Sequence, residues 1–226
     1  MQHAHKFETT VPDNAASVDA LVAKHGSQSH SHVQMLLALT QEPNSHPLPL
    51  LADAVHYLCL LHGRFPGVVD HAARYVTANA ARQWVIRICD AFAEERAYLT
   101  RLAVVVGPAP STTSHSSTDS SVLQLRHTLD MLAQSERRGC ALGAATTLAL
   151  DWAGIRRLLD HAALRSGMEP PRPSMPDRAA TLAILRDSDA DELMARAIHF
   201  GGRQLLHQHQ SLWSLLAERA ALRAEK

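Results

Sequence analysis

The stretch CALGAATTLAL, residues 140–150, decides the fold class of this chain. It carries no charged side chain, and most of it is alanine and leucine, which favour helix over strand. A helical segment without a polar face is normally buried on all sides. We therefore expect this segment to lie in the middle of a central helix, around which the other helices pack.

The apolar stripe of this segment continues in both directions, with spacings that alternate between three and four residues as on a core-facing helix. The pattern predicts the longest helix over about residues 120–166, with Gly167 as its C-terminal stop. Two further long helices are predicted over about 80–106 and from Ser188, as N-cap, to about 223. Shorter helices are predicted over 17–24, 31–41, 49–62, 68–77 and 176–186.

Long helices joined by short turns pack as bundles. The predicted fold is an all-α helical bundle with three or four long helices, ferritin-like or haem-oxygenase-like in architecture, plus short N-terminal helices. Residues 1–14 are expected to be a polar lead and residues 15–226 one helical-bundle domain. Within that domain we expect a mobile Ser/Thr loop over 108–121 and a Pro-rich linker over 168–176.

Composition excludes several classes of partner. The 226 residues carry 22 Lys and Arg against 22 Asp and Glu, so there is no electrostatic footprint for nucleic acid or an anionic membrane. No stretch is long and apolar enough to span a membrane, and the first residues lack the apolar core of a signal peptide. Cys59, Cys89 and Cys140 fall inside predicted helices, as buried reduced thiols would. We expect a cytoplasmic protein, and a homodimer is favoured only by base rates.

Five polar residues interrupt the apolar faces of the predicted helices: His62, Glu95, Glu136, His161 and His209. Buried acids and imidazoles are costly unless they pair with one another, with water or with a metal. These residues are therefore the candidates for a ligand-binding site, and catalytic residues stay unassigned. If the five side chains converge, they form a site in a dry interior.

A metal or haem site is one interpretation of this pattern. Carboxylates and imidazoles that project inward from facing helices build the di-metal sites of bundles, which makes Glu95, Glu136 and His161 the candidate ligands for iron or another divalent metal. Tyr98 and Gly139 stand where the Glu-x-x-His pairs of that design need histidine. Haem needs only one axial histidine, so a haem site stays open.

Two other interpretations need no metal. The same residues, with Arg96 at the edge of the apolar face, could line a pocket for a small molecule, and such a protein could be an oxidoreductase. Alternatively they form internal ion pairs and hydrogen bonds in a non-catalytic interaction or scaffold protein. The small residues Cys140, Gly143 and Thr147 on the central stripe indicate either close helix approach or room for a ligand. No phosphate-binding loop or nucleophile motif is present, so enzyme status stays open.

Three blocks of sequence carry a resemblance to a known family. They are LHGRFPGVVDHAA at 61–73, ERAYLT at 95–100 followed by GPAPST at 107–112, and RGCALGAA at 138–145. On these blocks the chain resembles an uncharacterised bacterial family of all-helical proteins of unknown function, over about residues 50–165. The resemblance implies a helical fold and no activity. A weaker similarity to ferritin-like and haem-oxygenase-like bundles rests on helix lengths alone.

Overall fold

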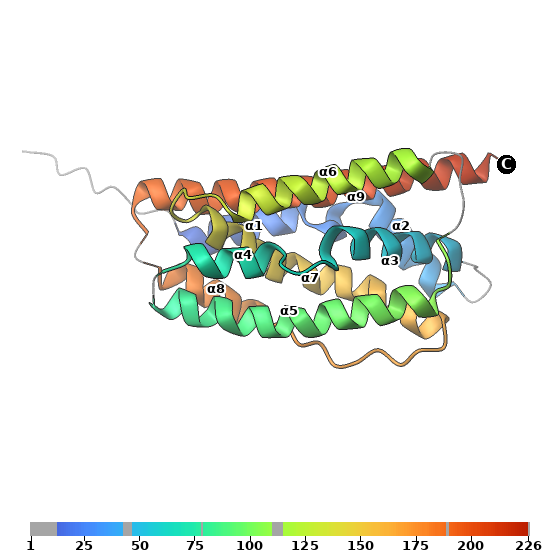
Figure 1. Ribbon diagram of the computed structural model, residues 1–226, viewed down its shortest axis with the longest axis horizontal. Coiled ribbons are helices and arrows are strands. Elements are labelled where there is room, and N and C mark those ends of the chain that lie inside the picture. Colours follow the sequence, from blue (N-terminus) through green and yellow to red (C-terminus); the bar gives the residue numbers. More distant parts are fainter. Residues whose placement is uncertain (1–12, 43–46, 78, 110–114, 189, 226) are drawn as a thin grey trace, which may run out of the picture.

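The computed structural model describes residues 13–42, 47–77, 79–109, 115–188 and 190–225. These residues form helices and connecting loops and contain no strand, which confirms the predicted all-α class (Figure 1). Three long helices run along the bundle: α5 (Asn79–Val105), α7 (Cys140–Arg165) and α9 (Glu192–Ala224). The remaining elements are α1 (Asn14–His25), η1 (Ser27–Ser29), α2 (Ser31–Gln41), α3 (Leu48–His62), α4 (Val68–Tyr75), α6 (His115–Ala133) and α8 (Arg178–Arg186).

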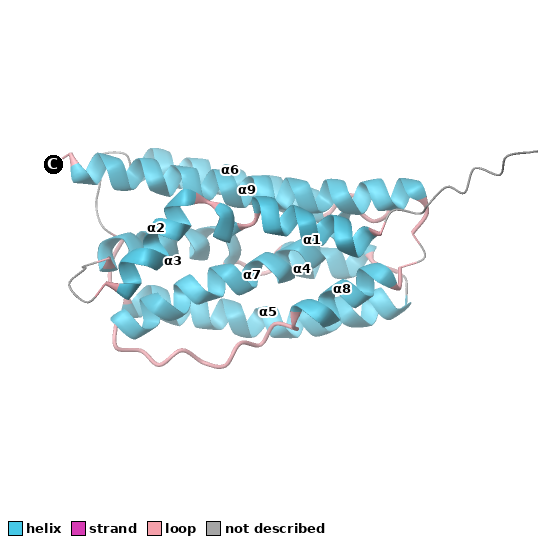
Figure 2. Ribbon diagram, turned by 180° about the vertical axis from the view of Figure 1, so that it is seen from behind, coloured by secondary structure: helices cyan, strands magenta, loops and turns pink. Residues whose placement is uncertain are grey.

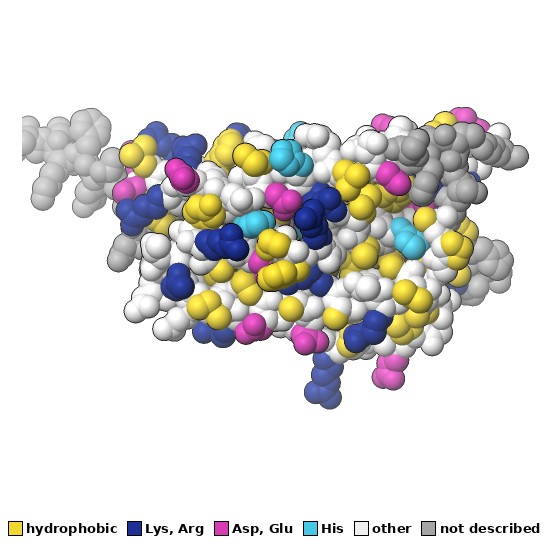
Figure 3. Space-filling model, viewed as in Figure 1, with side chains coloured by type: hydrophobic (Ala, Val, Ile, Leu, Met, Phe, Trp, Pro, Cys, Tyr) yellow, Lys and Arg dark blue, Asp and Glu magenta, His cyan; other side chains and the backbone are white. Residues whose placement is uncertain are grey.

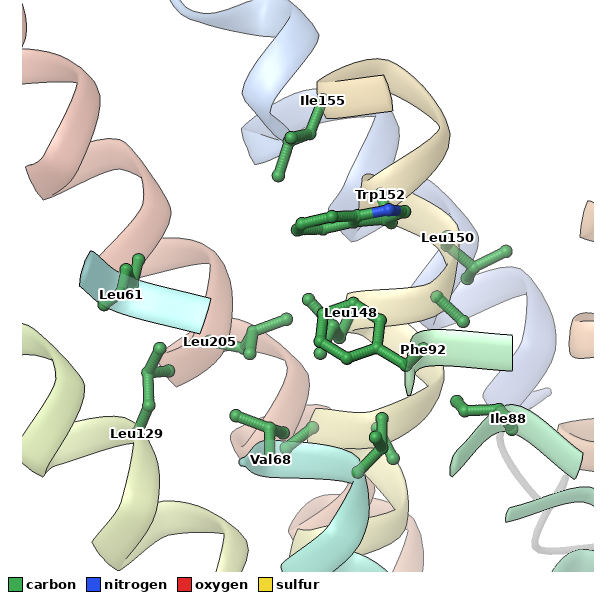
Figure 4. Close-up of a cluster of buried hydrophobic side chains, with 14 of the residues drawn as sticks. Leu61, Val68, Ile88, Phe92, Leu129, Leu148, Leu150, Trp152, Ile155 and Leu205 are labelled. Atoms are coloured by element: carbon green, nitrogen blue, oxygen red, sulfur yellow. The ribbon is translucent and has the colours of Figure 1, made fainter. Parts of the chain in front are cut away.

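Helix α7 is the centre of the bundle, as the uncharged stretch predicted. Every residue from 140 to 152 is buried, and α7 contacts α9 most extensively as well as α1, α3, α4, α5, α6 and α8. Figure 4 shows Leu148 and Trp152 of α7 in one cluster with Phe92 of α5 and Leu205 of α9. A helical segment with apolar side chains on all sides is removed from water only when other helices cover every side. This requirement places α7 in the middle of the bundle.

Two glycines set the close crossing of α7 and α9. A Cβ added at Gly143 would lie 2.0 Å from the carbonyl oxygen of Ile198, and one at Gly201 would lie 2.1 Å from that of Cys140. Neither position leaves room for a side chain, because the obstacle is backbone. The small residues of the central stripe therefore serve close helix approach, and the ligand space that was the alternative is absent at these two glycines.

The predicted helix over 120–166 is wrong as a single element. The structure has two helices instead, α6 ending at Ala133 and α7 beginning at Cys140, with a turn between them. Gly139 in this turn has φ +95°, a backbone conformation that residues with a side chain rarely adopt. Leu132 and Cys140 are both buried, so the apolar spacing continues across the turn and conceals the break.

The ends of two other predicted elements also differ. Of the predicted Ser/Thr loop over 108–121, residues 115–121 belong to α6, and residues 110–114 lie outside the described part. The N-cap of α9 is Asp191, whose carboxylate accepts the N–H of Met194 at 2.8 Å, whereas the Ser188 hydroxyl donates to Leu185 at the end of α8. Residues 168–176, the Pro-rich segment, contain no helix. Most of the predicted polar lead lies outside the described residues.

The apolarity of the helices and the charges on one face can be compared with what a membrane or a polyanion requires. None of the described helices combines the length and the apolarity that crossing a bilayer requires. On the face seen in Figure 3, acidic and basic side chains are interspersed, without a broad patch of one sign.

Candidate binding site

A chain of hydrogen bonds runs through the interior from η1 to α3. Asp151 accepts from the Ser27 N–H at 2.6 Å and from the Ser27 hydroxyl at 2.6 Å, and its Oδ2 lies 2.6 Å from Nδ1 of His209. The Nε2 atom of His209 lies 2.9 Å from Nε2 of His62. All four side chains are buried. This polar chain ties three other segments, η1, α9 and α3, to the carboxylate of α7.

The polar chain has a definite proton content. Since the Asp151 carboxylate accepts from His209, Nδ1 of that ring carries a hydrogen. The short contact between the two Nε2 atoms holds one further proton, because two bare lone pairs or two N–H groups would repel. Burial, then the neighbouring His209 and then Arg96 hold the pKa of His62 well below its usual range. The chain therefore excludes a second proton between the two rings.

Glu95 lies in the interior, as predicted, but it is already neutralised. Its Oε1 accepts from Arg156 Nη1 at 2.6 Å and from the Ser174 N–H at 3.1 Å, and its Oε2 accepts from Trp152 Nε1 at 3.0 Å. Arg156 also donates to Asp160 at 2.7 Å. The acid and the guanidinium compensate each other's charge, which is what makes their burial tolerable.

Tyr98 completes this group of charges on α5 and α7. Its hydroxyl donates to Asp160 at 2.9 Å, and its ring lies under the Arg156 guanidinium at 4.3 Å. Burial, followed by the charge of Asp160, raises the pKa of Tyr98 far above its usual value. The phenol therefore serves as a hydrogen-bond donor at neutral pH.

Arg96 is also committed to one partner. Its guanidinium donates to Asp70 at 2.8 Å and lies between the rings of Phe65 and Phe92, at 5.5 and 5.4 Å from their centroids. The Asp70 carboxylate accepts the Gly67 N–H at 2.8 Å as well. The α3–α4 turn is thereby fixed to α5.

The structure brings three of the six candidate residues to the aromatic pair of Phe92 and Trp152 and places a fourth, His209, against the ring of His62. The ring of His62 meets Trp152 at 5.6 Å and Phe92 at 6.2 Å, each edge to face, and the same ring meets His209. Trp152 in turn donates to Glu95, while Phe92 supports Arg96. These four residues are thus neighbours, but they belong to three separate groups: the polar chain, the Glu95–Arg156 pair and the Arg96–Asp70 pair.

The other two candidates lie elsewhere. The expectation that Glu136 faces inward is wrong: it is exposed in the turn between α6 and α7, because the helix on which it was placed ends at Ala133. His161 is only half-buried, and burial lowers its pKa. Among the described residues no group of three or more His, Cys, Asp or Glu could hold a metal ion. The predicted metal set of Glu95, Glu136 and His161 is therefore not assembled.

Several residues of the interior charge groups were missed from sequence. Asp151 is the hub of the polar chain and Arg156 is the partner of Glu95, while Asp53 pairs with Arg219 at 3.1 Å in a further group. A signal existed for Asp151, which is the first charge after the uncharged stretch. For the pairs of Arg156 with Glu95 and of Asp53 with Arg219 no local signal exists, since the two partners lie on different helices.

A cavity lies at the end of the bundle where α5, α7 and α9 begin. This end cavity has a volume of about 460 Å³. Its apolar lining includes Val76, Leu142 and Met194, and its polar lining includes Glu136 and Arg138. A second cavity, of about 240 Å³, lies beside Glu95 under the Pro-rich linker.

The charged side chains at the end cavity differ from those of the interior in whether they form ion pairs. In the described part of the chain, Glu136, Arg137 and Arg138 form no ion pair, although Arg137 lies over the ring of Phe200 at 5.6 Å. Their charged groups are thus available to a ligand, whereas those of Glu95 and Arg156 are occupied.

Fold and site together define an all-α bundle with neutralised interior charges and a cavity at one end. The chain belongs to a family of unknown function (DUF6975), whose model matches residues 22–224. This match confirms the resemblance to a helical family without an assigned activity. No curated protein and no solved structure matches the chain.

Proposed function

We propose that this protein binds a small molecule in the end cavity. The observation that carries the proposal is the cavity of about 460 Å³, which lies within the range of ordinary ligand pockets, roughly 300–1,000 Å³. Ligand pockets are mostly apolar with a few polar groups that fix orientation. The end cavity combines apolar and polar lining, and its rim charges Glu136 and Arg138 form no ion pair with the described residues.

The lining indicates the kind of ligand. The apolar side chains of Val76, Leu142 and Met194 favour a hydrocarbon or aromatic body. Glu136 and Arg138 carry opposite charges, so they favour a polar end with both donors and acceptors. Glu136 keeps a role as a ligand-binding candidate, but at a different site from Glu95.

The fluorescent amphiphile 8-anilinonaphthalene-1-sulfonate tests the proposal, because its emission rises when it enters an apolar site. We expect saturable binding at one site per chain. Ala80 lines the cavity from an exposed position, so Ala80→Trp should fill the cavity and abolish binding without disturbing the core.

Ala97 provides the matched control, because it is exposed on the same helix and lines neither cavity. Ala97→Trp should bind the dye as the unaltered protein does. Dye binding that is absent, or that survives Ala80→Trp unchanged, would show that the end cavity is not a ligand site.

A non-catalytic interaction or scaffold protein is the second candidate. It is favoured by the interior charges, since Glu95, Asp70 and Asp53 each pair with an arginine and Asp151 pairs with His209. Such pairs can fix which helix faces lie together. A scaffold protein would not bind the dye in the end cavity, and Ala80→Trp would leave its interaction with other proteins unchanged.

Several more specific expectations from the sequence remain predictions. Oxidoreductase activity, haem binding, a cytoplasmic location and a homodimer are compatible with the bundle, as is a ferritin-like or haem-oxygenase-like architecture. A metal held by Glu95, Glu136 and His161 is not part of the proposal, because these side chains do not meet.

A further inference from the structure

The linker between α7 and α8 crosses the outside of the bundle as an extended strap, residues 168–176 (Figure 2). Four prolines, Pro170, Pro171, Pro173 and Pro176, remove four of its backbone donors. No main-chain hydrogen bond joins two residues of 169–176, all of which are described. Residues 171–174 are exposed. The strap therefore has little structure of its own and depends on the surface beneath it.

Two polar contacts anchor the strap to the bundle. Arg156 Nη2 donates to the carbonyl of Pro171, and the N–H of Ser174 donates to Glu95 Oε1 at 3.1 Å. Both anchors are backbone groups of the strap, and both partners are charged side chains of the long helices. The bundle thus holds one carbonyl and one N–H of an extended chain.

The cavity of about 240 Å³ lies directly under this anchor. Glu95, Trp152 and Arg156 line it from the bundle, and Pro173 and Met175 line it from the strap. Glu95 is only 1% exposed and Arg156 only 4% exposed. The strap is what closes this cavity over the ion pair.

A structural role alone accounts poorly for the ion pair. Replacement of a buried ion pair by packed apolar residues is often neutral or stabilising, because both charges lose their hydration. A charged acceptor and a charged donor side by side are, however, well suited to a ligand that presents an N–H and a carbonyl.

We propose that the strap is a displaceable cover over a second binding site and that the ligand of this site carries a planar amide. The amide carbonyl accepts from Arg156 in place of Pro171, and the amide N–H donates to Glu95 in place of Ser174. An apolar body fills the cavity against Trp152 and Leu150 of the bundle. This site is separate from the end cavity, so each stands or fails by its own test.

Benzamide is the probe, because it joins a planar amide to a small aromatic body. The reporter is the indole N–H of Trp152, which bonds Glu95 at the site. In protein labelled with ¹⁵N tryptophan, Trp84, Trp152 and Trp213 give separate indole signals, and Trp152→Phe assigns the relevant one. We expect benzamide to shift the Trp152 signal saturably and to leave the other two in place.

Two substitutions of Ser174 distinguish the role of its backbone N–H from the role of its side chain. Ser174→Pro removes the N–H that occupies Glu95, and it should raise benzamide affinity about tenfold, the effect of one hydrogen bond to a charged acceptor. Ser174→Ala keeps that N–H and should leave the affinity unchanged. Benzoate has the same shape without an N–H donor and should bind at least tenfold more weakly than benzamide.

Three outcomes would overturn the proposal. Benzamide could leave the Trp152 signal unmoved, benzoate could bind as well as benzamide, or Ser174→Pro could fold without binding benzamide more tightly. If Ser174→Pro does not fold, the comparison of benzamide with benzoate on the unaltered chain decides.

Discussion

At the scale of the residue, Asp151 is the point at which α7, α9 and η1 are joined by hydrogen bonds. It accepts three hydrogen bonds, two from Ser27 and one from His209, and it is only 3% exposed. Gly26 allows this approach, since a Cβ there would lie 2.7 Å from Asp151 Oδ1. A carboxylate on the central helix thereby fixes the turn between α1 and α2.

Asp151→Asn should lower the free energy of unfolding by about 3 kcal/mol, the cost of leaving a buried donor without its charged acceptor. The amide cannot accept on both former oxygens, so either Ser27 or His209 loses its hydrogen-bond partner. Urea unfolding followed by circular dichroism measures the loss. Asp90→Asn, at an exposed position of α5, should change the stability by less than about 0.5 kcal/mol. Equal effects of the two substitutions would show that Asp151 is not a hub.

At the scale of the element, the bundle depends on the crossing of α7 and α9. Gly143 and Gly201 bring the two backbones into contact, and α7 contacts α9 more than it contacts any other helix. The close crossing also places Met194 of α9 against Gly139, at the turn that borders the end cavity. One pair of glycines thus positions both the core and the proposed ligand site.

Gly143→Ala should destabilise the protein by about 3 kcal/mol, because its Cβ meets the backbone of α9, which can yield only by moving the helix. Gly154→Ala is the control in the same helix. There the nearest atoms belong to the exposed Gln28 side chain, which can rotate away. Thermal unfolding of both variants should show the larger loss at Gly143, and the reverse order would contradict a tight α7–α9 crossing.

At the scale of the whole molecule, buried imidazoles connect stability to pH. Burial lowers the pKa of His62 well below its usual range and lowers that of His32 to about 4. Both rings are therefore neutral in the folded state at a pH where they are protonated in the unfolded chain. Their contribution is complete above an unfolded pKa of about 6.5 and is lost as the pH falls below that value.

Stability should accordingly decrease between pH 6.5 and pH 5, by up to about 1.4 kcal/mol per pH unit for each such ring. Urea unfolding at pH 7.5, 6.5 and 5.5 measures the slope. His62→Gln should reduce the slope by about one proton, whereas His127→Gln, at an exposed position of α6, should not alter it. An unchanged slope in His62→Gln would mean that His62 titrates alike in both states.

The sequence by itself determined the helices and their class. Apolar spacing, N-caps and stop residues are local signals, so the ranges of α2, α3 and α5 were predicted to within one or two residues. The uncharged stretch at 140–150 likewise determined that α7 is central, because a helix without a polar face has no other place. Glu95, His62 and His209 were recognised as interior residues for the same reason.

Only the tertiary structure decided which charges meet. Asp151 pairs with Ser27 across 124 residues of chain and with His209 across 58, and no local pattern encodes such partners. The break before α7 was hidden because the apolar period runs through it, and that break moved Glu136 from the interior to the rim of a cavity. Helix periodicity fixes which way a side chain faces. The packing of distant segments fixes what it faces, because Coulomb and hydrogen-bond energies depend on distances in space and not along the chain.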